Sequence, residues 1–389
     1  MFSVGWSLNR RCVPRPGTDA AHTQIRWTGV MSDPSSSPVV PSSAAPPSDD
    51  YSAEKRIGRL VAVTLGWWAH GGVRLLLAIA LLYYGFAKIV LGQFGVADMG
   101  DALVTQGEMS PMGMLWRMVA FSPLFQVLGG VAEAGAALAL LWRRSVPLGA
   151  LIAAADMSLV LVLNLGYDVP VKQIALALLI MSVLVLIPWM PRLARTFIGR
   201  GEIPRGPLPT LVPWRPLARV LDVLGPIAAL VLVGLVGWGV SSMYPERTTD
   251  ESAPAGVWEV QEDAAEPAAQ LSEDTRWSAL SFGEVAYDGA AAVQIRQADG
   301  ELLTGRYERL GEGTVELSLR PLRAPGQTLA EHTEIEPTTI TLQIDEQVDG
   351  TLRVSGEGQE LVLAPDDSGS VYYDRGFSWG VRADDPFNR

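Results

Sequence analysis

Three long apolar runs follow one another between residues 129 and 188 and set the plan of the chain. The first ends at the basic pair Arg143-Arg144, the second at the polar turn YDVPVK, and the third at Pro188. A complete run has about 20 residues, and because an α-helix rises about 1.5 Å per residue, it matches the roughly 30 Å hydrocarbon core of a bilayer. The pattern therefore predicts a polytopic membrane protein with an all-α transmembrane bundle.

Two further apolar stretches flank these runs, so that we predict five spans. The expected spans are residues 73–94, 122–142, 146–166, 171–189 and 217–240, and a short helix at 112–121 follows the polar connector 95–111. We expect residues 57–69 to lie in the membrane interface, because His70, two glycines and Arg74 interrupt the apolar pattern after them. Pro226 predicts a kink in the fifth span. Residues 191–215 are predicted to form a basic, Pro-rich loop.

The two ends of the chain differ from this bundle. Residues 1–55 are rich in Pro, Ser and Ala without apolar periodicity, which predicts a disordered tail. From residue 245 onward, short alternating runs such as TVELSLR and TITLQI are separated by Asp-Gly turn signals. This alternation predicts five to eight antiparallel strands in a small all-β sandwich or barrel. We thus expect a tail (1–55), a bundle (56–195), a basic loop with the fifth span (196–244) and a β-domain (245–389).

Charge is distributed unevenly over these parts, although the net charge of the whole chain is −12. Residues 1–244 carry 19 Lys and Arg against 13 Asp and Glu, whereas residues 245–389 carry 11 Arg, no Lys and 29 Asp and Glu. The basic residues lie before the first span, between the second and third, and between the fourth and fifth. By the positive-inside rule, the N-terminus is expected in the cytoplasm and the acidic β-domain outside. Such acidity argues against a nucleic-acid partner.

Cysteine and histidine exclude several kinds of site. Cys12 is the only cysteine, so that an intrachain disulfide, a CxxC redox pair and a Cys-based zinc site are impossible. The three histidines, His22, His70 and His332, lack ligand spacing within any span. We therefore expect no metal site and no bis-His haem.

Ionisable side chains within the predicted spans are the candidates for function, because a charge in a bilayer is costly. Glu133 and Asp156 lie near the middle of two neighbouring antiparallel spans, and Lys88 lies toward the outer end of the first. The expected cluster consists of Lys88, Glu133 and Asp156, with Tyr83, Tyr84 and Asn164 as hydrogen-bonding neighbours. Such a cluster is suited to relay protons or to hold a polar head group such as a quinone carbonyl. The alternative is that these groups only link the helices to one another.

Two further groups of polar residues have mainly structural interpretations. In the turn formed by Tyr167, Asp168, Pro170 and Lys172, the aspartate is suited to cap the following helix and the proline to occupy its first turn. Lys172 is expected either to pair with Asp168 or to point to lipid headgroups. Asp222 follows Arg219 by three residues, which predicts a surface ion pair between them. The aromatic and Arg-rich end at residues 372–389 predicts a packed terminal strand or a partner-binding surface.

Five segments of the chain together resemble the DoxX-like membrane proteins. In order, they are LLYYGFAKIVLGQF, SPMGMLWRM, a Glu-bearing helix of small residues that ends in WRR, PLGALI, and LNLGYDVPVK. The resemblance covers residues 70–195 and is closest to the subgroup with an extracytoplasmic C-terminal extension. It implies a four-helix membrane core, to which the fifth span adds a tether for the outer domain. By this resemblance, Lys88 and Glu133 match a Lys and a Glu that recur in the family, and residues 168–172 match the family's turn. Asp156 is a departure, because the family usually has an apolar residue at that position.

The functions of this family set our expectation for the chain. Some relatives are membrane subunits of thiosulfate:quinone oxidoreductases, and others associate with thiol or superoxide enzymes. The resemblance implies an integral component, itself non-catalytic, of a redox- or quinone-linked assembly in the bacterial inner membrane, with quinone as the candidate cofactor. The β-domain is expected to contact a membrane or extracytoplasmic protein partner. The alternatives are a small transporter or proton conduit that uses Glu133 and Asp156, and an enzyme with a quinone site in the bundle.

Overall fold

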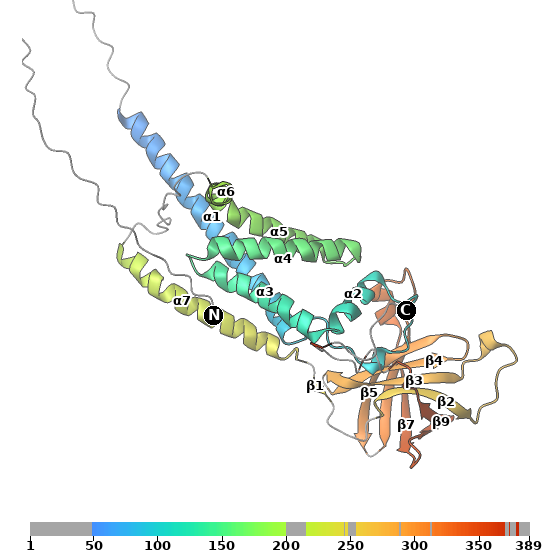
Figure 1. Cartoon of the computed structure of the whole chain (residues 1–389). Helices are drawn as coiled ribbons and strands as arrows, with labels where there is room; N and C mark the ends of the chain where they lie inside the picture. Colours follow the sequence, from blue (N-terminus) through green and yellow to red (C-terminus); the bar gives the residue numbers. More distant parts are fainter. Residues whose placement is uncertain are drawn as a thin grey trace, which may run out of the picture. The chain divides into compact units, whose positions relative to one another are not determined.

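The structure, a computed structural model, describes residues 49–199, 215–244, 246–247, 254–287, 289–311 and 313–369, together with residues 373, 379 and 380 (Figure 1). The described part of the predicted tail is the beginning of the first helix, so that most of the tail lies outside the described residues. Residues 372–389 also lie largely outside them.

Seven helices make up most of the described residues before 245. They are α1 (Asp49–Ile89), α2 (Pro111–Ala120), α3 (Pro123–Leu141), α4 (Val146–Gly166), α5 (Lys172–Leu186), α6 (Met190–Ile198) and α7 (Arg215–Ser241). Within the described residues, five helical segments are long and apolar enough to cross a membrane: Lys55–Ile89, Pro123–Leu141, Val146–Gly166, Lys172–Ile198 and Arg219–Ser241. The prediction of five spans is therefore confirmed by length and composition, and the chain is a membrane protein.

The start of the bundle differs from the prediction. The tail was predicted to extend to residue 55, with a separate interfacial helix at 57–69, whereas α1 is continuous from Asp49 to Ile89. Glycine within a helix costs only about 1 kcal/mol relative to alanine, and tertiary contacts of the neighbouring residues offset this cost. His70 Nε2 lies 3.0 Å from the carbonyl oxygen of Val185, and the His70 ring packs 5.5 Å from that of Trp189.

The segment after α5 also differs from the prediction. A short 3₁₀ turn, η2 (Ile187–Trp189), leads directly into α6, where a basic loop was expected from residue 191. Helix α6 has a proline near its N-terminus and ends at Gly199, whose positive φ of 67° closes the helix. The remainder of the predicted loop, residues 200–214, lies outside the described residues. Pro226 lies within α7.

Glycine contacts set the spacing of the helices around the polar cluster. A Cβ atom at residue 130 would lie 2.5 Å from the carbonyl oxygen of Gly85, and one at residue 85 would lie 2.7 Å from the backbone nitrogen of Ala134. Gly149 on α4 makes the same kind of contact with α3, where its Cβ would lie 2.7 Å from the nitrogen of Leu140. The backbones of α1, α3 and α4 thus approach one another as closely as small residues permit.

The described strands after residue 245 form a closed antiparallel barrel. Its strands are β2 (Gly256–Asp263), β3 (Trp277–Tyr287), β4 (Ala290–Gln297), β5 (Leu302–Gly311), β6 (Thr314–Pro321), β7 (Thr338–Glu346), β8 (Leu352–Gly356) and β9 (Gln359–Pro365). They pair in the order β3-β2-β9-β8-β7-β6-β5-β4, and β4 pairs with β3 to close the ring of eight. The short strand β1 (Glu246–Arg247) adds to β3, and the helix α8 (Leu329–Glu334) lies between β6 and β7. Of the two predicted architectures, the barrel is therefore the correct one.

The alternation of the strands fills the barrel and leaves a polar outer face. Side chains such as Leu280, Phe282 and Val293 are fully buried in its core, as expected for eight strands, whose interior is just wide enough for side chains. The neighbouring outward positions on β3 and β4 include Ser281 and Gln294, which are nevertheless buried. Another segment of the chain therefore covers this part of the barrel.

The covering segment is the connector between α1 and α2, residues 90–110, which contains the 3₁₀ turn η1 (Met99–Asp101). Gly100 lies against the barrel so closely that a Cβ atom there would be 2.8 Å from the Cα of Gly283. Ser281 Oγ donates a hydrogen bond to the Gly100 carbonyl over 3.3 Å, and the Leu103 N–H donates to Gln294 Oε1 over 2.9 Å.

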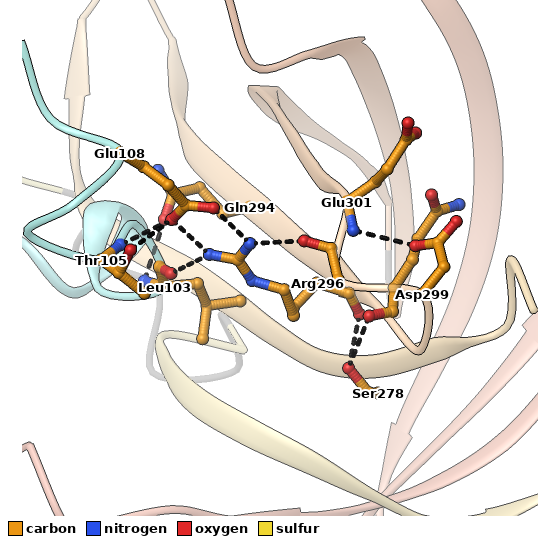
Figure 2. A network of polar contacts seen from close by, with 10 residues as sticks. Leu103, Thr105, Glu108, Ser278, Gln294, Arg296, Asp299 and Glu301 are labelled. Atoms are coloured by element: carbon orange, nitrogen blue, oxygen red, sulfur yellow. Dashed lines mark hydrogen bonds and ion pairs between the residues drawn. The ribbon is translucent and has the colours of Figure 1, made fainter. Parts of the chain in front are cut away.

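Arg296 on β4 forms an ion pair with Glu108 near the end of this connector, as Figure 2 shows. Its Nη1 and Nη2 donate to the two carboxylate oxygens of Glu108 over 2.7 and 2.8 Å, and Nη2 also donates to the Leu103 carbonyl over 2.6 Å. A bidentate Arg–carboxylate pair has both charge and geometric specificity. The hydrogen bond from Arg296 is the main reason why the pKa of Glu108 is lowered to about 2.

This shift predicts how the connection responds to acid. Because the folded-state pKa of Glu108 lies below the ordinary value of 4.5, the stabilisation is present above about pH 4.5 and is lost as the pH falls toward 2. We expect Glu108→Gln to lower the stability of the barrel at pH 6 by about 1 kcal/mol or less, since the pair is partly solvated. The melting temperatures of wild type and variant, followed by near-UV circular dichroism, should converge near pH 2. A difference that is independent of pH would contradict this prediction.

Candidate intramembrane site

The charged pair between α1 and α3 forms the centre of the site. Lys88 follows Gly85 by three residues and Glu133 follows Gly130 by three residues, so that the close approach of the two glycines brings both side chains together one helical turn later. Lys88 Nζ lies 2.7 Å from Oε1 and 2.6 Å from Oε2 of Glu133. The side chains are 12% and 2% exposed, respectively. The structure thus brings together the first two residues of the predicted cluster.

Asp156, the third predicted member, reaches the same place from α4. Its carboxyl lies close enough to interact electrostatically with both Lys88 and Glu133. Its Oδ2 atom is buried and has no hydrogen-bond partner among the described residues. Two carboxyl groups and one ammonium group therefore share this region, and one carboxyl oxygen is left without a donor.

A cavity of about 140 Å³ opens beside these three residues. Its walls come from α1, the start of the connector, α2, α3, α4 and α5, and most of them are apolar. Four of the side chains that line it are aromatic: Tyr84, Phe94, Trp116 and Phe125. The Phe94 and Trp116 rings pack with their centroids 4.8 Å apart. An apolar chamber with a few convergent polar groups has the general form of a small-molecule site.

The other predicted neighbours of the cluster divide into two groups. Tyr84 and Asn164 line the cavity, and Lys88 Nζ lies 5.8 Å from the centroid of the Tyr84 ring. Tyr83 is 47% exposed and does not line the cavity, because it lies one residue, or about 100°, further around α1. Tyr83 therefore does not belong to the cluster as predicted.

Two glutamines of the cavity wall, Gln93 and Gln126, are not among the site residues predicted from the sequence. Gln126 on α3 is 1% exposed, accepts a hydrogen bond from the Phe94 N–H over 3.2 Å and donates one to the Gly95 carbonyl over 2.9 Å. It thereby ties the beginning of the connector to the bundle. Gln93 directly precedes Phe94 in the connector. Its Oε1 is buried and has no hydrogen-bond partner among the described residues. A polar residue in the apolar run PLFQVLGG is the signal that could have identified Gln126.

The predicted turn lies at one edge of the cavity, through Val171. Asp168 adopts a left-handed conformation with φ of 48° and pairs with Lys172, which holds the pKa of Asp168 below its ordinary value. The prediction that Asp168 caps the next helix is wrong, since α5 begins at Lys172 and its N-cap, Val171, has no side-chain hydrogen bond. Pro170 precedes the helix instead of occupying its first turn, and Tyr167 terminates α4 as its C-cap.

Asp222 has a different partner from the one predicted. Its Oδ1 lies 3.2 Å from Nη1 of Arg143, in the connection between α3 and α4, whereas Arg219 was expected. This contact joins α7 to the rest of the bundle at an exposed position. A tertiary neighbour thus replaces the residue one turn away in the sequence.

Comparison with known proteins identifies one relative. A stretch of 127 residues, 32% of the chain, is 32% identical to YwoB of Bacillus subtilis (strain 168), and the match covers 77% of that protein, which is itself described as uncharacterized. No protein-family model matches the chain. No solved structure matches it either.

Proposed function

The chain belongs to the same family as the Bacillus subtilis protein YwoB, and we propose that it is a non-catalytic component of a redox- or quinone-linked membrane assembly. Its role in that assembly is to hold a lipid-soluble ligand of the quinone class inside the bundle. The observation that carries this proposal is the apolar cavity, into which Lys88, Glu133 and Asp156 bring charge. Charged groups within a membrane are costly and are generally retained for function.

A DoxX-like identity for this family is part of the proposal. The motifs YGFAK and YDVPVK support it, since they supply Lys88 and the turn beside the cavity. The pairing of Lys88 with Glu133 gives a physical reason for a Lys and a Glu that recur together. The quinone class follows from the same resemblance and from an aromatic-lined chamber that accepts a planar ring.

We further propose that the barrel faces the extracytoplasmic side of a bacterial inner membrane and contacts a protein partner there. The Lys and Arg bias of the connectors supports this orientation. The strongly acidic composition of residues 245–389 suits a partner with a basic surface.

The ligand is tested by blocking the cavity. Gly129 lines it, and within 4 Å a Cβ atom there would meet only the Cδ of Lys88, at 3.8 Å, an ordinary van der Waals contact. We expect the full chain, purified in mild detergent, to carry ring compounds of the quinone class. In the Gly129→Leu variant the amount of bound compound should fall at least about tenfold, because the added side chain occupies the binding volume. Gly135→Leu on the same helix is the matched control, since a Cβ there meets nothing within 4 Å. Mass spectrometry of the bound small molecules and of co-purified proteins gives the readout; equal ligand content in the two variants would contradict the proposal.

A second candidate function, proton conduction or small-molecule transport, rests on Asp156. A carboxyl oxygen without a partner next to Glu133 offers a site to which a proton or a substrate group can transfer. In liposomes with an enclosed pH indicator, this function requires that Glu133→Gln and Asp156→Asn slow proton flux while the chain still assembles with its partners. Unchanged flux in both variants would leave the non-catalytic component as the better assignment.

A further inference from the structure

We propose that the cavity is selective for an aromatic ring that carries hydroxyl groups, as in a phenol or a hydroquinone, over the corresponding carbonyl compound. This inference rests on the proposed function, because it names the chemical form of the ligand that the same cavity prefers. It is carried by the volume of the cavity, its aromatic lining and the hydrogen-bonding character of its polar atoms.

The volume limits the ligand to about one ring. A protein cavity of about 150 Å³ lined by apolar side chains binds benzene, and the cavity described above has about 140 Å³. A single six-membered ring with small substituents therefore fills it. An isoprenoid or alkyl tail of such a ligand must lie outside this volume, toward lipid.

Hydrogen-bonding groups on the wall separate into satisfied and unsatisfied ones. Both carboxylate oxygens of Glu133 accept from Lys88, and both ends of the Gln126 amide are bonded to the connector backbone. Asp156 Oδ2 and Gln93 Oε1 are buried and without partners among the residues that the structure describes. A carboxylate oxygen and an amide oxygen are both acceptors. Asn164 carries a donor and an acceptor, so that it serves either kind of ligand.

Two unpaired acceptors on different walls select a ligand that donates. A ring hydroxyl can donate to Asp156 or to Gln93. A ring carbonyl can accept from a wall donor such as Lys88 or Tyr84, but it leaves both unpaired acceptors unsatisfied. Sites built to hydrogen-bond a substrate hydroxyl reject analogues that lack it more strongly than apolar sites reject a missing methyl group. We expect a preference of at least about tenfold. For a quinone, which is reduced to the hydroquinone by two electrons and two protons, such a preference raises the midpoint potential of the bound couple by about 30 mV.

The test uses three probes of similar size in place of the native ligand. Phenol presents a donor, toluene replaces the hydroxyl by a methyl group, and 4-pyranone presents a carbonyl without a donor. Each is titrated by ligand-detected NMR into the full chain in nanodiscs, and empty nanodiscs correct for partition into lipid. We expect phenol to bind at least about tenfold more tightly than either of the others. Asp156→Leu and Gln93→Met, which remove one acceptor each, should reduce this preference, whereas Asp156→Asn, which retains an acceptor, and the control Gly135→Leu should preserve most of it.

The outcomes separate the two proposals. If 4-pyranone or toluene binds as tightly as phenol, the donor selectivity is wrong, although the cavity remains a ring-binding site. If the preference is unchanged in both Asp156→Leu and Gln93→Met, these acceptors do not produce it and the inference is overturned. If no probe binds above the level of empty nanodiscs, both the inference and the proposed ligand function fail.

Discussion

Lys88→Met is expected to lower the free energy of unfolding by about 3–5 kcal/mol, because it leaves the Glu133 carboxylate buried without its counter-charge. Glu133→Leu should have a smaller effect, because the Asp156 carboxyl remains close enough to interact with Lys88. Replacing both partners by apolar residues of similar size is often neutral or stabilising, so that the double variant should be more stable than Lys88→Met. Unfolding in mixed micelles, followed by circular dichroism, measures all four proteins of this cycle.

The matched control is Lys172→Met, which breaks the exposed pair with Asp168 at the edge of the same bundle. Exposed pairs contribute little, and we expect a much smaller change there than at Lys88. Additive effects of the two buried substitutions would mean that Lys88 and Glu133 are not energetically coupled, and the assignment of this pair as the centre of the site would have to be withdrawn.

Gly130→Ala is expected to destabilise the bundle by about 1–3 kcal/mol, the usual cost of adding a methyl group to a filled interface. The new Cβ would lie 2.5 Å from the Gly85 carbonyl oxygen and 2.9 Å from the Cβ of Lys88. Since backbone cannot rotate away as a side chain can, α1 and α3 must separate. The separation should also lengthen the Lys88–Glu133 contact, and we therefore expect the variant to lose cavity ligand as well as stability.

Gly135→Ala provides the comparison on the same helix, because its Cβ would have open space around it. Alanine has the higher helix propensity, and the control should be neutral or slightly stabilising in the same micelle titration. Equal loss of stability at residues 130 and 135 would show that the effect of Gly130→Ala arises within α3 itself and not from its contact with α1.

The spans could be predicted from the sequence because their apolar length alone determines them. The third predicted span, residues 146–166, coincides with α4, and the second differs from α3 by one residue at each end. Lys88, Glu133 and Asp156 could also be identified, since a charge in an apolar run is conspicuous wherever the run folds.

The remaining features depend on contacts between distant residues. The continuity of α1 follows from the packing of His70 onto Val185 and Trp189, and the partner of Asp222 lies 79 residues away in Arg143. Ser281 and Gln294 occupy outward positions of an alternating pattern, where the sequence predicts exposure to solvent. Only the covering connector explains their burial.

The contact between Glu108 and Arg296 also constrains how the chain is threaded. Both residues must lie in the same aqueous compartment to form it, so that an even number of membrane crossings must separate them. Between these two positions lie four segments long and apolar enough to cross a membrane: α3, α4, α5–α6 and α7. A chain in which one of these segments failed to insert would place the connector and the barrel on opposite sides of the membrane, and the 2.7 Å ion pair could not form.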